Sequence, residues 1–165
     1  MKIVVTGSPG TGKSTVSKLL GSIFGLEVIN DSAFAKSSGS GAIDRISKEF
    51  EVDMGKFSSR FGKYAKKMPG WIAEGHLFCE AKISPDIAFV LRTDTGALEK
   101  RLSARNYTEE KIQDNVMCEG TAYCLKMAKK TFQKKCRVIE IDTTAGAKEA
   151  LINILSHISG DGESR

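Results

Sequence analysis

The sequence predicts an α/β fold in which helices flank a five-stranded parallel β-sheet. Short apolar runs alternate along the chain with segments of helical periodicity, and this alternation is typical of parallel sheets with right-handed crossovers. A glycine-rich motif directly follows the first apolar run, where many α/β proteins carry a phosphate-binding loop. A length of 165 residues is enough for one such domain with a sizeable core.

The five predicted strands are short apolar runs. They cover residues 3–5, 27–29, 71–73, 87–91 and 138–141. The fourth run is apolar throughout, as expected for a strand that is buried on both faces of a sheet.

Two segments show an apolar face at helical spacing. The face of the first consists of Val16, Leu19, Leu20, Ile23 and Phe24. We expect Gly25 to end this helix, because glycine is the usual residue in the left-handed conformation at a helix C-terminus. The face of the closing helix consists of Ala147, Ala150, Leu151, Ile154, Leu155 and Ile158.

Residues 7–14, GSPGTGKS, match the phosphate-loop pattern G-x-x-x-x-G-K-[ST]. Glycines let backbone N–H groups turn toward phosphate oxygens, and a helix beginning near Lys13 directs its positive end at the anion. We expect Lys13 to act catalytically on the β- and γ-phosphates and Ser14 to bind Mg²⁺. The residues predicted to contact ATP are Pro9, Gly10, Thr11, Gly12, Lys13, Ser14 and Thr15.

The motif alone leaves the reaction open. A GTPase needs a guanine-reading N-K-x-D motif, which the sequence lacks, and motor or helicase folds need a longer chain. Two long polar segments, 31–68 and 105–115, do not fit simple crossovers and are candidate flaps over a site. The patch 37–41 within the first is predicted to be a flexible loop. These features favour phosphoryl transfer to a small acceptor.

The net charge is +5, and basic residues concentrate in 56–67 and 126–137. Solvated helix faces are the favoured interpretation of both stretches, and attraction of polyphosphates or RNA is the alternative. The four cysteines form no C-x-x-C pair, so we expect reduced thiols and no zinc site. Without a membrane-length apolar run or a signal peptide, we expect a cytoplasmic protein, with the nucleus left open.

The sequence resembles adenylate kinase isoenzyme 6, an atypical adenylate kinase and ATPase of archaea and eukaryotic nuclei. The resemblance is carried by VTGSPGTGKST at 5–15, EGH at 74–76, FVLRTDT at 89–95, and RL, RNY, KIQDN and CE within 101–119. The E-G-H variant favours an archaeal source.

This resemblance implies a division of the single domain into a core, a nucleoside-monophosphate-binding insertion and a lid. The core would be 1–30, 69–104 and 116–158, the insertion 31–68, the lid 105–115, and the flexible tail 159–165. The family implies Mg²⁺-dependent phosphoryl transfer from ATP to AMP with slower ATP hydrolysis. It also implies a role in small ribosomal subunit maturation, through a small-subunit ribosomal protein and the pre-ribosomal particle.

Outside the phosphate loop, the resemblance implies further site residues. Glu74, where several family members have Asp, would hold the Mg²⁺ water shell, and His76 would orient water or couple hydrolysis to partner binding. Arg105 would stabilise charge on the transferring phosphoryl group, and Arg101, four residues earlier, is expected on the same helix face. Asn106 replaces the family's glycine and tolerates a positive φ.

Arg92, at the end of the fourth strand, is expected at the site edge. Acceptor recognition stays open, with candidate residues Asp31, Ser32, Arg45, Arg60 and Lys63. The function also has alternatives. One is a nucleotide-switched ribosome assembly factor in which kinase activity is incidental, and the other is a kinase for a different small acceptor.

Overall fold

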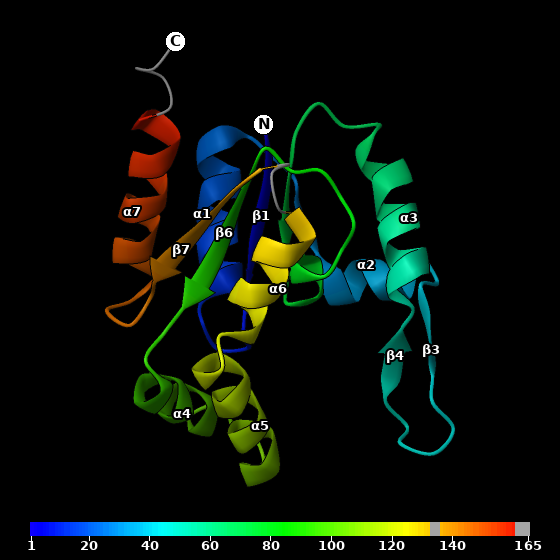
Figure 1. Cartoon of the computed structure of the whole chain (residues 1–165), viewed down its shortest axis with the longest axis vertical. Helices are drawn as coiled ribbons and strands as arrows, with labels where there is room; N and C mark the ends of the chain where they lie inside the picture. The colour runs from blue at the N-terminus through cyan, green and yellow to red at the C-terminus, as the bar shows by residue number, and fades with distance from the viewer. Residues whose placement is uncertain (133–135, 161–165) are drawn as a thin grey trace.

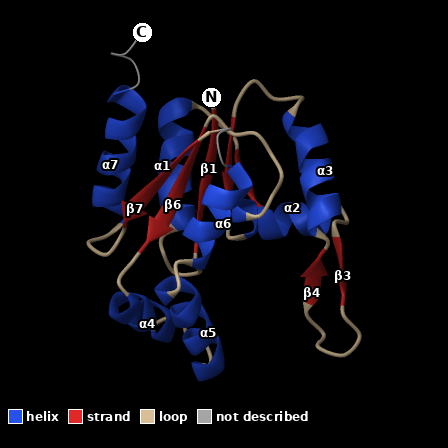
Figure 2. Ribbon diagram, viewed as in Figure 1, coloured by secondary structure: helices blue, strands red, loops and turns tan. Residues whose placement is uncertain are grey.

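The computed structural model of the chain describes residues 1–132 and 136–160. Its main sheet consists of β1 (Lys2–Gly7), β2 (Val28–Asn30), β5 (Trp71–Glu74), β6 (Ile87–Arg92) and β7 (Arg137–Asp142). All strands are parallel and lie in the order β2-β5-β1-β6-β7 (Figures 1 and 2). The predicted fold class and the positions of all five predicted strands are therefore confirmed.

Helices cover both faces of this sheet (Figure 1). On one face, α1 (Lys13–Phe24) and α7 (Ala147–Ser159) pack against β1 residues such as Ile3 and Val5. On the other face, α3 (Met54–Ala65) and α6 (Tyr123–Phe132) pack with Val4. The β1 side chains alternate between two hydrophobic clusters, as the period of a strand requires.

The first helix has a narrower buried face than predicted. Val16 and Leu20 are fully buried, whereas Leu19 and Ile23 are 41% and 52% exposed. The helix ends as expected, because Gly25 adopts the left-handed conformation at its C-terminus with φ 62°. The predicted flexible tail, 159–165, lies largely outside the described residues, as do residues 133–135 of the second basic stretch.

The segment 31–68 contains more regular structure than predicted. It holds α2 (Asp31–Ser37), the antiparallel hairpin of β3 (Gly41–Ile43) and β4 (Phe50–Val52), and α3. The hairpin projects away from the main sheet (Figure 1). The patch 37–41, predicted to be a flexible loop, joins the end of α2 to the start of β3 through a hydrogen-bonded turn. In that turn the Ser38 and Ser40 hydroxyl oxygens are 2.6 Å apart, and the Asp53 backbone N–H donates to the Ser40 carbonyl oxygen at 2.8 Å.

The segment 105–115 joins α4 (Thr95–Ser103) to α5 (Glu109–Gly120). It consists of a loop and the first two turns of α5. Leu98 and Leu102 of α4 and Ile112 of α5 are buried against one another in a small hydrophobic cluster of their own. The two helices thus form a hairpin that lies beyond the carboxyl ends of β1 and β6 (Figure 1). No helix among the described residues is long and apolar enough to cross a membrane.

An aromatic cluster connects α3 to the sheet. The Phe61 ring is fully buried and lies edge-on to Trp71 and Phe78, with centroid distances of 5.2 and 4.9 Å. Phe34 of α2 contacts the same ring at 5.3 Å. Phe61 therefore attaches both helices of the 31–68 segment to β5.

Replacing Phe61 by alanine should lower the free energy of unfolding by about 3–5 kcal/mol, because the lost ring leaves a cavity in a packed aromatic cluster. Urea denaturation monitored by circular dichroism measures the change. As a control, Ile46→Ala should change the stability by less than about 0.5 kcal/mol, since Ile46 is 93% exposed. Equal effects of the two substitutions would contradict this account of the core.

Candidate functional site

The phosphate loop lies between the end of β1 and the start of α1. Gly10 within it has φ 89°. A Cβ atom there would approach the Leu98 and Leu102 side chains at 2.7 and 3.0 Å. Glycine is required both for the backbone conformation and for the close approach of α4.

A cavity of about 280 Å³ lies over this loop. Its walls are Pro9, Gly10, Gly12, Lys13, Ser14, Thr15, Asn30, Asp31, Ser32, Glu74, Gly75, Arg105 and Tyr107. We call it the phosphate-loop cavity. It brings together Lys13, Ser14, Glu74 and Arg105, which the sequence had singled out from three separate segments. Thr11 does not line the cavity, because it is buried and its hydroxyl donates to the Ser8 carbonyl oxygen at 2.9 Å.

The Lys13 ammonium donates a hydrogen bond to the Ser8 carbonyl oxygen at 2.8 Å. Burial lowers the pKa of Lys13, and the nearby Asp31, Cys124 and Glu74 groups oppose this shift in that order. The ammonium thus lies at the cavity wall with one backbone partner, which an anion in the cavity could replace.

Glu74 ends β5, and its carboxylate is almost completely buried. It accepts hydrogen bonds from the Asn30 amide at 2.7 Å and from the Ser14 hydroxyl at 3.3 Å. Carboxylate and hydroxyl oxygens are ligands that Mg²⁺ prefers. The described residues contain no group of three or more His, Cys, Asp or Glu side chains that could hold a metal. A cation at Ser14 and Glu74 would therefore complete its shell with water or phosphate oxygens.

Asp31 anchors the loop that follows β5. Asp31 is only 2% exposed. Its carboxylate accepts hydrogen bonds from the backbone N–H groups of Ser32 at 2.6 Å and Leu77 at 2.9 Å. Gly75 has φ 143°, and a Cβ atom there would collide with this carboxylate. His76 Nδ1 lies 3.4 Å from Asp31 Oδ2. Asp31, an acceptor candidate in the sequence, thus positions the loop that carries His76.

His76 lies outside the phosphate-loop cavity and lines an adjoining pocket of about 350 Å³. The lining residues are Ser32, Lys36, Phe50, Val52, Met54, His76, Leu77 and Glu80. We call it the His76 pocket. Ser32 lines both spaces, so they meet at this residue.

Lys36 is a candidate that the sequence reasoning missed. Its exposed side chain makes no hydrogen bond or ion pair with the residues that the structure describes. It follows Ser32 by four residues, so both point from the same face of α2. That spacing was the signal that could have identified Lys36.

The two arginines near the end of α4 have different surroundings. Arg101 donates from Nη2 to the carbonyl oxygens of Thr143 and Thr144 at 2.8 and 2.9 Å, so it ties α4 to the loop after β7. Arg105 lies beyond the end of α4 and lines the phosphate-loop cavity. The expectation that both share a helix face is wrong, because the helix ends between them. Asn106 has φ 56°, which confirms the expected positive φ.

Arg92 is not directed into the cavity. Its guanidinium donates from Nε to the Glu119 carboxylate and from Nη2 to the Glu119 carbonyl oxygen at 2.9 Å. Glu119 is 1% exposed and also accepts from the Ser8 hydroxyl at 2.6 Å. Arg92 therefore neutralises a buried carboxylate that holds the phosphate loop from behind. Glu119 is a supporting residue that the sequence reasoning did not identify.

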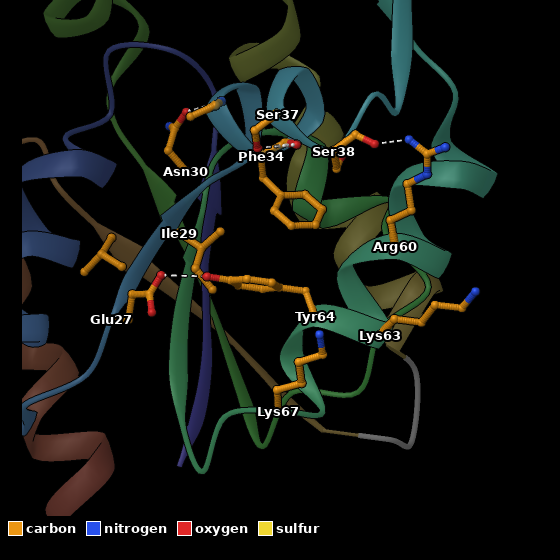
Figure 3. A pocket seen from close by; sticks show the side chains of 12 residues that line it. Glu27, Ile29, Asn30, Phe34, Ser37, Ser38, Arg60, Lys63, Tyr64 and Lys67 are labelled. Atoms are coloured by element: carbon orange, nitrogen blue, oxygen red, sulfur yellow. Dashed lines mark hydrogen bonds between the residues drawn. The ribbon is translucent and has the colours of Figure 1, made fainter.

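The remaining acceptor candidates are dispersed. Arg45 lies between β3 and β4, outside both spaces at the phosphate loop. Arg60 and Lys63 line a third cavity of about 670 Å³ between β2, α2 and α3 (Figure 3). Of the acceptor candidates from the sequence, Asp31 and Ser32 line the phosphate-loop cavity. Lys36 lines the adjoining His76 pocket and is a further candidate.

Comparisons with known proteins show which family the chain belongs to. Residues 3–121 match the model of a family described as AAA domain. A Thermococcus kodakarensis protein named "Putative adenylate kinase" is 33% identical over 165 residues, covering 100% of this chain and 89% of that protein. An Archaeoglobus fulgidus protein of the same name is 34% identical over 166 residues, covering 100% and 86%.

Solved structures of low sequence identity share the fold. Shikimate kinase from Acinetobacter baumannii in complex with shikimate superposes with a TM-score of 0.62 at 18% identity, covering 99% of this chain and 95% of that chain. Deoxyadenosine kinase from M. mycoides with bound dATP superposes with a TM-score of 0.64 at 18% identity, covering 96% and 100%.

Gly75→Ala should destabilise the chain more than Gly146→Ala does. Both glycines have positive φ, so both substitutions introduce backbone strain of about 1–3 kcal/mol. Only at Gly75 would the new methyl group also collide with a buried carboxylate, whereas nothing lies within 4 Å of a Cβ atom at Gly146. Thermal unfolding of the two variants measures the difference. Equal losses would show that Asp31 does not restrict this loop.

Proposed function

Because the chain belongs to the AAA domain family and to the family of the archaeal proteins named "Putative adenylate kinase", we propose that it transfers the γ-phosphoryl group of ATP to AMP. The observation that most supports this proposal is the junction of two spaces at Ser32. One space contains the phosphate loop. The other is a pocket with apolar walls and the Lys36 ammonium, which has no partner among the residues that the structure describes.

In this proposal the triphosphate of ATP lies in the phosphate-loop cavity. Backbone N–H groups of the loop and the start of α1 contact the phosphate oxygens. Lys13 exchanges its bond to the Ser8 carbonyl oxygen for bonds to the β- and γ-phosphates. Thr15, at the cavity wall, contacts the α-phosphate.

We assign Mg²⁺ to Ser14 and Glu74, whose oxygen donors are suited to this ion. When bound, the ion would neutralise charge on the β- and γ-phosphates. Asn30 holds one carboxylate oxygen of Glu74 in place and, as the N-cap of α2, accepts from the Ala33 backbone N–H at 3.0 Å. The position of α2 is thereby linked to the orientation of Glu74.

We assign AMP to the His76 pocket. The side chains of Phe50, Val52, Met54 and Leu77 provide apolar walls for the base. The Glu80 carboxylate accepts from the Tyr123 hydroxyl at 2.8 Å and has further acceptor capacity for an exocyclic amino group. Lys36 would bind the phosphate of AMP near Ser32, where the pocket meets the γ-phosphate site.

The transfer itself requires position and positive charge rather than covalent catalysis. An oxygen of the AMP phosphate attacks the γ-phosphorus, and the bond from this phosphorus to the β–γ bridging oxygen breaks. Two molecules of ADP result. The Arg105 side chain, which has no hydrogen-bond or ion-pair partner within the described part of the chain, would stabilise the charge that spreads over the transferring group.

The same site would hydrolyse ATP slowly when the His76 pocket contains water instead of AMP. His76, half-exposed and next to the Asp31 carboxylate, is suited to orient that water. The alternative function is a ribosome assembly factor whose nucleotide state controls its binding to a small-subunit ribosomal protein. A pull-down with that protein in the presence and absence of ATP tests it, because a switch requires nucleotide-dependent capture.

The main test follows ATP labelled at the γ-phosphate, with Mg²⁺ and with or without AMP. An adenylate kinase places the label in ADP faster than it releases labelled phosphate. Label found only as free phosphate, at a rate that AMP does not change, would reject the kinase in favour of the ATPase. A screen of other acceptors addresses a kinase of different specificity.

Lys13→Ala should reduce both phosphoryl transfer and ATP hydrolysis by at least about 100-fold, because both need the charge on the γ-phosphate stabilised. Initial rates of the purified variant measure the loss. Lys18→Ala removes the same type of side chain from the exposed side of α1 and should leave both rates unchanged. Normal turnover of the Lys13 variant would exclude the phosphate loop from catalysis.

Lys36→Ala should raise the KM for AMP by about 10- to 100-fold, because a charge-assisted hydrogen bond contributes about 1.5–3 kcal/mol. The KM for ATP should stay unchanged. Steady-state kinetics with either substrate varied separates the two effects. Arg45→Ala, at the tip of the hairpin, is the control and should alter neither constant. A larger effect on ATP than on AMP would place Lys36 on the donor side.

A further inference from the structure

The largest of the three cavities described above has no role in the proposed reaction. Its volume is about 670 Å³, within the range of sites for small ligands. Glu27 directly precedes the edge strand β2, to which Ile29 belongs. Phe34 comes from α2, and Lys63 and Tyr64 come from α3 (Figure 3). We call it the edge cavity.

Helix α2 separates the edge cavity from the His76 pocket. Ala33, Phe34 and Ser37 line the edge cavity, whereas Ser32 and Lys36 line the His76 pocket. The two spaces share no lining residue. The edge cavity shares one lining residue, Asn30, with the phosphate-loop cavity, and the Asn30 side chain is bound to the Glu74 carboxylate and to the Ala33 backbone N–H. A ligand in the edge cavity that leaves these bonds in place could therefore be bound while the proposed ATP and AMP sites are both filled.

The floor of the edge cavity is aromatic. The Tyr64 ring lies across it toward β2 (Figure 3), and its hydroxyl donates to the Glu27 carboxylate at 2.9 Å. This hydrogen bond raises the pKa of Tyr64 and fixes the orientation of the ring. The ring packs against Phe34 at a centroid distance of 5.5 Å, yet Tyr64 remains 38% exposed. It thus offers a rigid surface on which a flat ring can stack.

The rim of the edge cavity is positively charged. Arg60 and Lys63 lie on α3, and Lys67 lies in the turn that follows this helix (Figure 3). The Lys63 and Lys67 side chains have no hydrogen-bond or ion-pair partner among residues 1–132 and 136–160. Glu27 is the acidic residue of the lining, and Tyr64 already uses its carboxylate. The charge therefore favours an anionic ligand.

We propose that the edge cavity is a second, non-catalytic binding site for a nucleoside monophosphate. The base stacks on the Tyr64 ring, and the phosphate binds Lys63 and Lys67. An apolar floor and a cationic rim match the two halves of this ligand, a flat heterocycle and a phosphate. Two lysines of the basic stretch 56–67 would thereby bind the phosphate of this ligand. This inference does not depend on the proposed reaction.

The test is equilibrium dialysis of the full chain with labelled AMP, after the ATP and AMP sites have been filled by two adenosines joined through five phosphates. Binding of this bisubstrate compound is measured first, so a failure of the proposed catalytic sites is detected separately. We expect one further AMP per chain. Unlabelled AMP should displace it more effectively than adenosine or inorganic phosphate does. No AMP bound beyond the bisubstrate compound would overturn the proposal.

Lys63→Glu and Tyr64→Ala should each weaken this further binding by about tenfold or more, because one loses the phosphate contact and the other the stacking surface. Lys126→Glu makes the same charge change on the exposed side of α6 and is the matched control, expected to bind normally. Thermal unfolding verifies that each variant is folded. Unchanged AMP binding by the Lys63→Glu variant would show that AMP binds elsewhere and would refute the proposed site in the edge cavity.

Discussion

The parallel pairing of β1 with both β5 and β6 is the constraint on which the site depends. The register places Val5 opposite Glu74 and Gly7 opposite Leu91, so the phosphate loop leaves the sheet directly beside the Glu74 carboxylate. The carboxyl ends of parallel strands lie on the same side of the sheet, and the loops that lead from the strands into the helices lie there too. The dipole of α1, the Ser14 hydroxyl and the loop after β5 consequently meet in one small cavity.

Two sets of buried polar contacts fix the loops at the carboxyl ends of these strands. Glu119, neutralised by Arg92, binds Ser8 behind the phosphate loop, and Asp31 binds the loop that follows β5. Such buried carboxylates are tolerable only when they are fully hydrogen-bonded, which makes the surrounding loops rigid. Helix α2 lies between two further spaces, because one of its faces lines the edge cavity and the other lines the His76 pocket.

The sequence by itself determined the number and positions of the strands in the parallel sheet and the donor half of the site. Five apolar runs predicted five strands, since a strand buried on both faces must be apolar wherever it occurs. The phosphate-loop motif carries its own geometry, because its glycines and following helix are local features. Gly25 and Asn106 were likewise predictable, as their left-handed conformations depend on the residue type itself.

Only the tertiary structure decided the rest, because it depends on contacts between segments distant in the chain. Arg92 and Arg101 were expected near the site together with Arg105, yet the first two are bound to Glu119 and to the loop after β7. The spacing of Lys36 from Ser32 was visible in the sequence, but the pocket that Lys36 lines is formed only because α2 lies beside the hairpin of β3 and β4. That hairpin escaped prediction because its strands are too short to show alternation. A side chain's function depends on which partners the fold brings to it, and the local pattern does not contain them.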